Sequence, residues 1–278
     1  MKFALKLLAL ADLLFIVLLS VSGSFSGALH EILYVLSFAV PFFVAAGFLP
    51  RLRAEREEIS GVAEKPKRYL SIDKKGLLLF LPVIPLLVGV IFVISYLTSL
   101  VLELFGAVNT LPEMGSLFLM IVDHALLPSL LEELLFRYLP LLLLLPYSKR
   151  SCIFVSSLFF ALIHLNLFQI PYAFVAGLIL IVLDVITESI LPSLVMHFVN
   201  NLLSVVYMSY CSDPSAAVIF FSLLGASCLL SLVPIILQRR EYLRLLKGCF
   251  VKGESSDHSP VVLFVGVTLI LAISNLAF

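Results

Sequence analysis

Long uninterrupted apolar runs dominate this chain and restrict what it can fold into. Several are roughly 18 residues or longer, the length that an α-helix needs to cross the hydrocarbon core of a bilayer. Hydrophobic residues make up 62% of the 278 residues and charged residues 13%. Strands of a membrane β-barrel alternate between lipid-facing and inward-facing residues over about ten positions, and these runs do not alternate. The sequence therefore predicts an all-α, polytopic transmembrane helix bundle.

We expect this bundle to be one transmembrane domain over residues 1–278, with nine spans at 5–22, 30–49, 77–104, 116–146, 151–168, 170–187, 189–209, 215–237 and 260–277. The first stretch also resembles a signal peptide, because Lys2 and Lys6 precede an apolar run that ends in VSGSFSGA. Eight spans remain if that stretch is not a span. The connections between 146 and 190 are very short, so the divisions there are the least sharply defined.

The basic residues outside the apolar runs gather in three loops, 51–76, 147–150 and 238–259. The loops on the other side of the predicted membrane carry no Lys or Arg. Cytoplasmic loops of membrane proteins are enriched in Lys and Arg. We therefore expect the N-terminus and the three basic loops in the cytoplasm, the C-terminus outside, and the protein in a bacterial cytoplasmic membrane.

The charge balance and the cysteines exclude several classes of partner. The formal net charge is zero, which argues against a basic surface for nucleic acid. The cysteines lie far apart without a CxxC pair, at Cys152, Cys211, Cys228 and Cys249. They therefore indicate neither a disulfide framework nor a thiolate metal site. The expected partners are membrane lipid and a peptide or protein near the membrane.

Polar side chains inside the predicted spans mark a candidate site. A charged side chain at the bilayer centre costs roughly 2.5–3.5 kcal/mol on insertion scales, so such residues are functional candidates by default. They are Glu132, Glu133 and Arg137 in span 116–146, His164 in span 151–168, and His197, Asn200 and Asn201 in span 189–209.

Helical spacing suggests how these groups meet. Glu133 and Arg137 are four residues apart, so they share a face and can form an ion pair. Glu132 is rotated by about 100° from Glu133 and is free to face elsewhere. Carboxylate, imidazole and amide groups can together activate a water and stabilise an oxyanion. Glu132, His164 and His197 are also a possible zinc ligand set with an open position for water.

Other functions bury the same groups. Glu–Arg pairs can hold helices together, and proton-coupled or small-solute transporters place ionisable residues within the membrane. An inactive scaffold that binds membrane peptides is a third reading. Spacing alone therefore leaves an endopeptidase, a transporter and a scaffold open.

Three motifs resemble those of the CPBP intramembrane proteases, the family that includes CAAX prenyl endopeptidases and the Abi-type, bacteriocin-processing enzymes. EELLFR at 132–137 resembles their EExxxR motif, FALIH at 160–164 their FxxxH motif, and HFVNN at 197–201 their HxxxN motif. The resemblance covers about 115–205. Other intramembrane proteases fit poorly, because the chain has no HExxH, no rhomboid-like GxSG and no GxGD.

The resemblance implies hydrolysis of a peptide bond in a membrane-associated substrate, prenylated or not. It implies that Glu132 activates the water, with Glu133 and Arg137 as its neighbours. His164 and His197 are implied as partners of the water or of a metal, and Asn201 as the oxyanion donor. Two mechanisms of water activation remain open, one with zinc and one in which the glutamate activates the water without a metal.

Several further residues carry weaker expectations. Tyr138 stands where the family often has glycine, which would crowd the helix near the substrate. Asp123 and His124 are candidates for lining the cavity, and Pro128 is expected to kink the helix before the glutamates. Asp184 is expected at the membrane interface rather than in a site.

Overall fold

A computed structural model of the chain describes residues 1–61, 69–107 and 116–249, and these are helical almost throughout. The first two hydrophobic helices and the basic segment after them are α1 (Lys2–Ser22), α2 (Ala28–Ala46) and α3 (Leu49–Ser60). Then follow α4 (Lys74–Phe80), α5 (Val83–Leu104), α6 (Leu117–Met120), η1 (Ile121–Leu126), α7 (Leu127–Glu133), η2 (Leu134–Tyr138) and α8 (Leu139–Leu143). The remaining helices are α9 (Lys149–Leu162), α10 (Ile170–Thr187), α11 (Leu191–Tyr210), α12 (Pro214–Leu237) and α13 (Arg239–Cys249).

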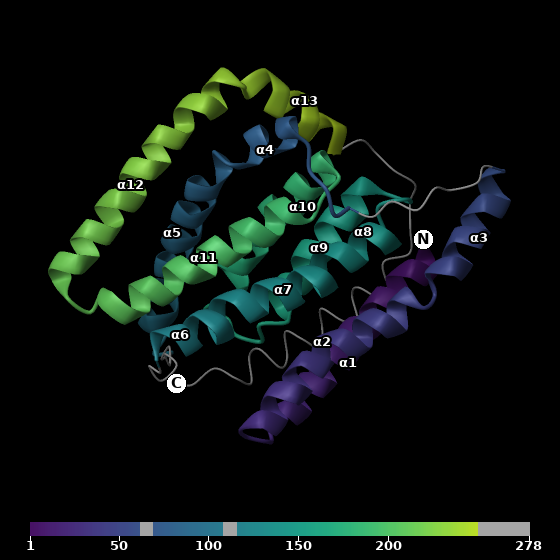
Figure 1. Cartoon of the computed structure of the whole chain (residues 1–278), viewed down its shortest axis with the longest axis horizontal. Helices are drawn as coiled ribbons and strands as arrows, with labels where there is room; N and C mark the ends of the chain where they lie inside the picture. The colour runs from purple at the N-terminus through teal and green to yellow at the C-terminus, as the bar shows by residue number, and fades with distance from the viewer. Residues whose placement is uncertain (62–68, 108–115, 250–278) are drawn as a thin grey trace.

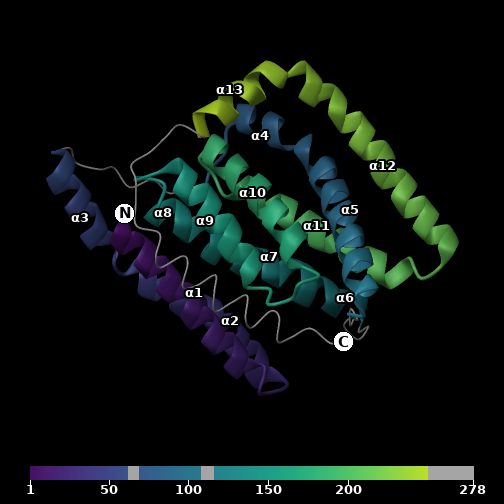
Figure 2. The ribbon, with the colours of Figure 1, turned by 180° about the vertical axis from the view of Figure 1, so that it is seen from behind.

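The helices form a bundle with the motif-bearing segments in the middle. Figure 1 shows α12 along one edge and α1 and α2 along the other, with α7, α9, α10 and α11 between them. The view from behind in Figure 2 gives the same order, with α5 beside α12. α5 packs against both α10 and α12, and therefore joins the outer helix to the central ones.

The predicted all-α membrane fold is confirmed. Within the described residues, six helical stretches are long and apolar enough to cross a membrane. They correspond to the predicted spans at 5–22, 30–49, 77–104, 170–187, 189–209 and 215–237. The stretch 117–143 is helical as well but is broken up by η1 and η2. The predicted last span, 260–277, lies outside the described residues.

The span predicted at 151–168 is too long. Its helix, α9, ends at Leu162, and residues 163–169 form a turn in which Leu165 has a positive φ of 48°. α10 begins directly after this turn with Pro171 in its first turn, a position that suits proline because no intrahelical donor is lost there. The apolar residues of the turn hid this break from a reading of hydropathy alone.

The first helix belongs to the core of the bundle. The Phe15 ring lies 4.6 Å from that of Phe38 in α2 and 5.6 Å from that of Phe136 in η2. Phe15, Phe38 and Phe136 are all buried. α1 therefore supports the segment that carries the first motif.

The bundle has two chemically different ends. One, which we call the basic end, comprises the N-terminus, α3, α4, residues 147–150 and α13 (Figure 1). The other, the far end, comprises the turns at 23–27, 163–169 and 211–213. The first group contains most of the basic residues, as the charge pattern predicts.

Candidate active site

Glu132 and Glu133 lie at the end of a short α-helical stretch between two π-helical segments. η1 precedes this stretch and η2 follows it, so the helix is wider on both sides of the carboxylates. π-helical turns are rare and occur often at functional sites. The kink expected from Pro128 takes this form, because η1 ends at Leu126 and Pro128 lies in the first turn of α7.

Glu133 contacts both Arg137 and His197. Its Oε1 lies 2.8 Å from His197 Nδ1, and its Oε2 lies 3.6 Å from Arg137 Nε. The side chains of Glu133 and Arg137 are buried, at 1% and 0% exposure. The predicted Glu133–Arg137 ion pair is present, although the π turn at 134–138 stretches it beyond hydrogen-bond length. Glu133 is also the acceptor that fixes the ring of His197.

Glu132 faces another way, toward the open side of His197. Its Oε2 lies 3.7 Å from His197 Nε2, and its side chain is 13% exposed. Glu132 lines a large cavity that Glu133 does not reach. The imidazole of His197 therefore stands between the two carboxylates, with Nδ1 toward the buried one and Nε2 toward the one in the cavity.

His164 lies in the turn after α9, two residues past the end of the helix. Its Nδ1 lies 2.8 Å from the carbonyl oxygen of Phe160, which is the geometry of a ring N–H donating to a helix-terminal carbonyl. This bond leaves Nε2 free and holds the ring at the cavity wall. The four-residue spacing between Phe160 and His164 therefore places His164 beyond the end of α9, where it bonds the Phe160 carbonyl, and not on the same face of a continuous helix.

Phe160 connects the cationic and imidazole groups. Its ring centroid lies 4.1 Å from the Arg137 guanidinium carbon, 5.2 Å from the His164 ring and 5.5 Å from the His197 ring. An aromatic face attracts a guanidinium, and this attraction is strongest where water is excluded. The sequence pointed to Phe160 as part of a motif but gave it no role.

Asn201 lies on the same cavity, one helical turn after His197. Its Oδ1 accepts a hydrogen bond of 3.2 Å from Asn200 Nδ2. The amide N–H groups of Asn201 are therefore left to donate to a third group. Asn200 is the more buried of the two and serves to orient Asn201.

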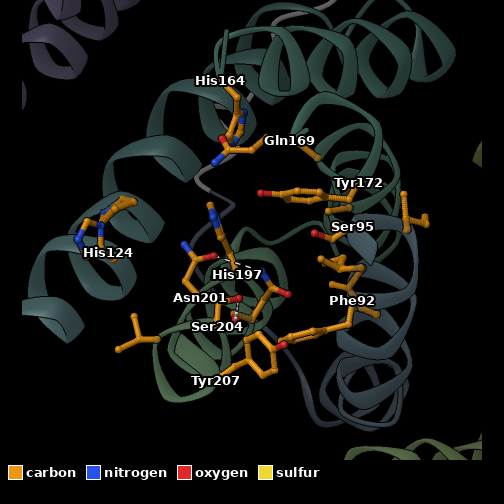
Figure 3. A pocket seen from close by; sticks show the side chains of 18 of the residues that line it. Phe92, Ser95, His124, His164, Gln169, Tyr172, His197, Asn201, Ser204 and Tyr207 are labelled. Atoms are coloured by element: carbon orange, nitrogen blue, oxygen red, sulfur yellow. Dashed lines mark hydrogen bonds between the residues drawn. The ribbon is translucent and has the colours of Figure 1, made fainter. Parts of the chain in front are cut away.

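The cavity holding these groups has a volume of about 1450 Å³. It is lined by parts of α2, α5, α7, α9, α10, α11 and α12 and by the adjoining turns. Figure 3 shows His164, Gln169, Tyr172, His197 and Asn201 around it. Four of the six predicted site residues line it, namely Glu132, His164, His197 and Asn201, and Glu133 and Arg137 lie behind His197.

In a comparison with protein families, residues 114–203 match the family described as Type II CAAX prenyl endopeptidase Rce1-like. Residues 114–203 are therefore similar to an Rce1-like domain. This domain is that of CAAX-type intramembrane endopeptidases, in agreement with the resemblance of the three motifs. Curated proteins and solved structures gave no match.

All six predicted site residues fall inside the Rce1-like domain. The cavity extends beyond it, because α2, α5 and α12 also contribute to the lining. The part of the chain outside the domain therefore shapes the space in front of the motifs.

The side chains of the Rce1-like domain do not assemble the expected zinc site. In the described part of the chain, no three His, Cys, Asp or Glu side chains are grouped so as to hold a metal ion. His197 Nδ1 is directed at Glu133, and His197 Nε2 lies 3.7 Å from Glu132 Oε2. The zinc set of Glu132, His164 and His197 therefore stays a prediction.

Two residues of the Rce1-like domain behind Glu133 were missed or misread. Asp184 was expected at the membrane interface, but it is fully buried. Its Oδ1 accepts a 3.2 Å hydrogen bond from the backbone N–H of Ser193, in the first turn of α11. Asp184 thereby ties α10 to the helix that carries His197. Nothing in the local sequence pairs these residues, because the contact joins two helices.

The remaining expectations concern access to the cavity. Tyr138 stacks on Phe42 of α2, with ring centroids 6.2 Å apart, and does not line the cavity. The crowding expected from Tyr138 is thus directed toward α2 rather than toward the substrate space. Asp123 and His124 do line the cavity, as expected, and both are exposed.

Proposed function

We propose that this protein is an intramembrane endopeptidase in which Glu132 activates a water for attack on a peptide bond. The observation that carries the proposal is the arrangement around His197. The carboxylate of Glu133 accepts a hydrogen bond from Nδ1 of His197. Nε2 of the same ring then faces Glu132 on the cavity wall. A buried carboxylate, an oriented imidazole and a second carboxylate in a cavity are the parts of a general-base site.

The gap between Glu132 and His197 suits one water. At 3.7 Å the two polar atoms are too far apart for a direct hydrogen bond. A water between two such atoms is a common arrangement. Held there, it can donate one proton to Glu132 and one to Nε2 of a neutral His197, with a lone pair directed into the cavity.

The proposed reaction follows from these positions. Glu132 takes a proton as the water oxygen bonds to the carbonyl carbon. The amide of Asn201 donates to the oxyanion that forms, because its Oδ1 is already held by Asn200. As the C–N bond breaks, Glu132 returns the proton to the leaving nitrogen. The products are a carboxylic acid, which keeps the second proton of the water, and an amine, and no other reactant is consumed.

Glu133 and Arg137 support this chemistry without touching the substrate. Glu133 fixes the tautomer of His197, since an acceptor at Nδ1 requires the proton there. Arg137 balances the charge of Glu133 and also donates to the Phe136 carbonyl at 3.2 Å. His164, with Nε2 free, serves as a second partner for the carbonyl or the oxyanion.

The substrate class follows from the cavity and from the family. A space of about 1450 Å³ with a largely apolar wall accommodates an extended peptide together with apolar side chains or a lipid group. The name of the matched family refers to prenylated CAAX proteins. We therefore propose a membrane-associated peptide or protein, with or without a prenyl group, as substrate.

A cleavage assay on the purified full-length protein tests the proposal. Reporter peptides, prenylated and plain, are incubated in detergent or lipid, and products are identified by mass. We expect one defined cleavage, insensitive to chelators, since in the proposed reaction Glu132 activates the water without a metal. Loss of activity with a chelator and its return with zinc would establish the metal route instead.

Further assays on the same purified protein distinguish the endopeptidase from a transporter and from a scaffold. A transporter would show solute or proton uptake in proteoliposomes that depends on Glu132, with no peptide products. A scaffold would bind peptide without cleaving it and would tolerate Glu132→Gln. Either result would contradict the endopeptidase.

A further inference from the structure

The last described helix, α13, has one face that is exposed and cationic. At about 100° per residue, Arg239, Leu243 and Lys247 follow one another along this face, and Arg240 and Arg244 lie beside them. All five side chains are exposed. α13 therefore presents four cations and one leucine to its surroundings.

The other face of α13 holds the helix to the bundle. Tyr242 donates a hydrogen bond to the carbonyl of Leu79 in α4, and Cys249 at the end of α13 is buried. α13 also packs against α10, and Figures 1 and 2 both show it beside α4. The cationic face is thus held in a fixed place at the basic end.

Two lysines of α4 extend this face. Lys74 and Lys75 are exposed at the start of α4, and Lys75 Nζ lies 2.6 Å from Oε1 of Glu241 in α13. The cations of the two helices therefore form one surface. We call this surface the basic patch, and it comprises Lys74, Lys75, Arg239, Arg240, Arg244 and Lys247.

The carboxylates of α4 and α13 do not neutralise the basic patch. Glu241 is shared between Lys75 and Arg244, at 2.6 and 2.7 Å. Asp73 accepts a hydrogen bond from the backbone N–H of Gly76 and caps α4. Among the described residues, no acidic side chain forms an ion pair with the other cations of the patch. The basic patch therefore keeps a surplus of positive charge.

The basic patch lies where two membrane-crossing helices end. α12 is long and apolar enough to cross a membrane, and only Gln238 separates its last residue from α13. α4 begins the stretch Lys74–Leu104, which meets the same criteria. Exposed leucines accompany the cations, namely Leu243 at 55% and Leu78 at 62% exposure. An amphipathic helix of this kind lies between the headgroups and the acyl chains of a bilayer.

We propose that the basic patch binds the headgroups of anionic phospholipids, with Leu243 and Leu78 against their acyl chains. Lys and Arg near the membrane surface attract anionic headgroups, whereas a zwitterionic headgroup carries no net charge. The exposed leucines favour a lipid over a free phosphate. No residue of the patch is among those that line the active-site cavity. The lipid site therefore does not depend on the proposed endopeptidase function.

Fluorescence quenching in vesicles tests the site without any need for activity. The chain contains no tryptophan, so Leu243→Trp gives a single reporter inside the basic patch. The full-length protein is placed in mixed vesicles of phosphatidylcholine and phosphatidylglycerol, with one lipid or the other brominated near its headgroup. Brominated phosphatidylglycerol should quench as though it were enriched about fivefold at the reporter, the factor expected from one Lys or Arg near the surface. Val218→Trp, 66% exposed near the start of α12, should show no preference between the lipids.

Charge variants of the reporter chain show which cations are responsible. Arg240→Gln with Lys247→Gln should remove most of the preference for phosphatidylglycerol. Arg53→Gln with Arg150→Gln removes the same charge from the basic end outside the patch and should leave the preference intact. High salt should weaken the preference, because it screens the exposed cations.

Two results would overturn the proposal. One is equal quenching by the two brominated lipids at Leu243→Trp, or at Leu78→Trp if the first variant fails to fold. The other is loss of the preference on addition of soluble glycerol phosphate, which would identify a site for free phosphate. Persistence of the preference in the presence of glycerol phosphate, together with its loss in the double variant of α13, supports the lipid site.

Discussion

Glu132 and Glu133 are adjacent in the chain but have different neighbours. Glu133 is enclosed by Arg137 and His197, both within 3.6 Å, and its side chain is 1% exposed. Glu132 meets the cavity and reaches His197 only across a gap of 3.7 Å. An ion-paired, hydrogen-bonded carboxylate is a weak base. The division of labour between the two therefore follows from their contacts.

Arg137 gives the first prediction at the scale of single residues. Arg137→Lys should lose most activity, because an ammonium cannot contact Glu133, the Phe136 carbonyl and the Phe160 ring together. Arg137→Ala should also destabilise the protein by about 3–5 kcal/mol, since it leaves a buried carboxylate unpaired. Thermal unfolding and peptide cleavage measure the two effects. Full activity in the lysine variant would show that the planar guanidinium is unnecessary.

Asp12 gives a prediction of the opposite effect on stability, because its replacement should stabilise the protein. It is fully buried in α1, and within the described residues neither carboxylate oxygen has a hydrogen-bond partner. A buried unsatisfied polar group costs roughly 1–3 kcal/mol. Asp12→Leu should therefore raise the melting temperature and leave cleavage unchanged, while Asp12→Asn, which keeps a polar group there, should gain less. A lower melting temperature for Asp12→Leu would reveal a partner for the carboxylate.

Contacts within one helix were easier to predict than contacts between helices. The Glu133–Arg137 pair and the separate direction of Glu132 follow from spacing along one helix. The hydrogen bond from His197 to Glu133 joins residues 64 positions apart, and the bond from Ser193 to Asp184 joins α11 to α10. Periodicity carries no information on such contacts, because they depend on how helices pack.

At the scale of helices, hydropathy located the spans and missed their irregularities. The boundaries of α10 agree with the predicted 170–187 because Pro171 and the residues after Thr187 limit it. The end of α9 at Leu162 and the two π-helical segments were not predicted. The apolar runs continue through these segments despite a few polar residues, so only backbone geometry distinguishes them. These irregularities also position site residues. The end of α9 positions His164, and the π-helical segments flank the two glutamates.

α13 gives a prediction on pH. Glu241 lies 2.6 Å from Lys75 Nζ and 2.7 Å from Arg244 Nη2, and Tyr242 donates to the Leu79 carbonyl, so α13 is fixed to α4. The hydrogen bond from Lys75 and then that from Arg244 hold the pKa of Glu241 below its ordinary value. This stabilisation is present above the ordinary pKa of a glutamate and is lost as the pH falls through the lowered one.

Hydrogen exchange of residues 239–249 measures that effect. Exchange in α13 should quicken as the pH falls below about 4.5, after correction for the intrinsic rate. In Glu241→Gln the corrected rate should no longer depend on pH in this range. High salt should weaken the contact at neutral pH, because Lys75 and Arg244 are exposed and salt screens their charges. An unchanged corrected rate in the wild-type protein would mean that other contacts hold α13.

The orientation of the whole molecule in the membrane gives a further prediction. Single cysteines at Ser60 and Ser255, in a chain without its own cysteines, should resist an impermeant thiol reagent added outside intact cells and react after permeabilisation. The reason is the gathering of Lys and Arg in loops 51–76, 147–150 and 238–259. Ser255 lies outside the described residues, so it tests the sequence prediction alone. Rapid labelling from outside would reverse the topology.

The central claim is that Glu132, and not its neighbour, carries the proton. The most direct measurement is cleavage of one reporter peptide by purified Glu132→Gln and Glu133→Gln, with matching elution and melting behaviour required of Glu132→Gln. Removing a general base commonly costs on the order of 10²–10⁴ in rate. We expect a loss of that order in Glu132→Gln, and lower stability with measurable turnover in Glu133→Gln. Wild-type turnover in Glu132→Gln would contradict the mechanism, and an inactive Glu133→Gln beside it would assign the proton to the other carboxylate.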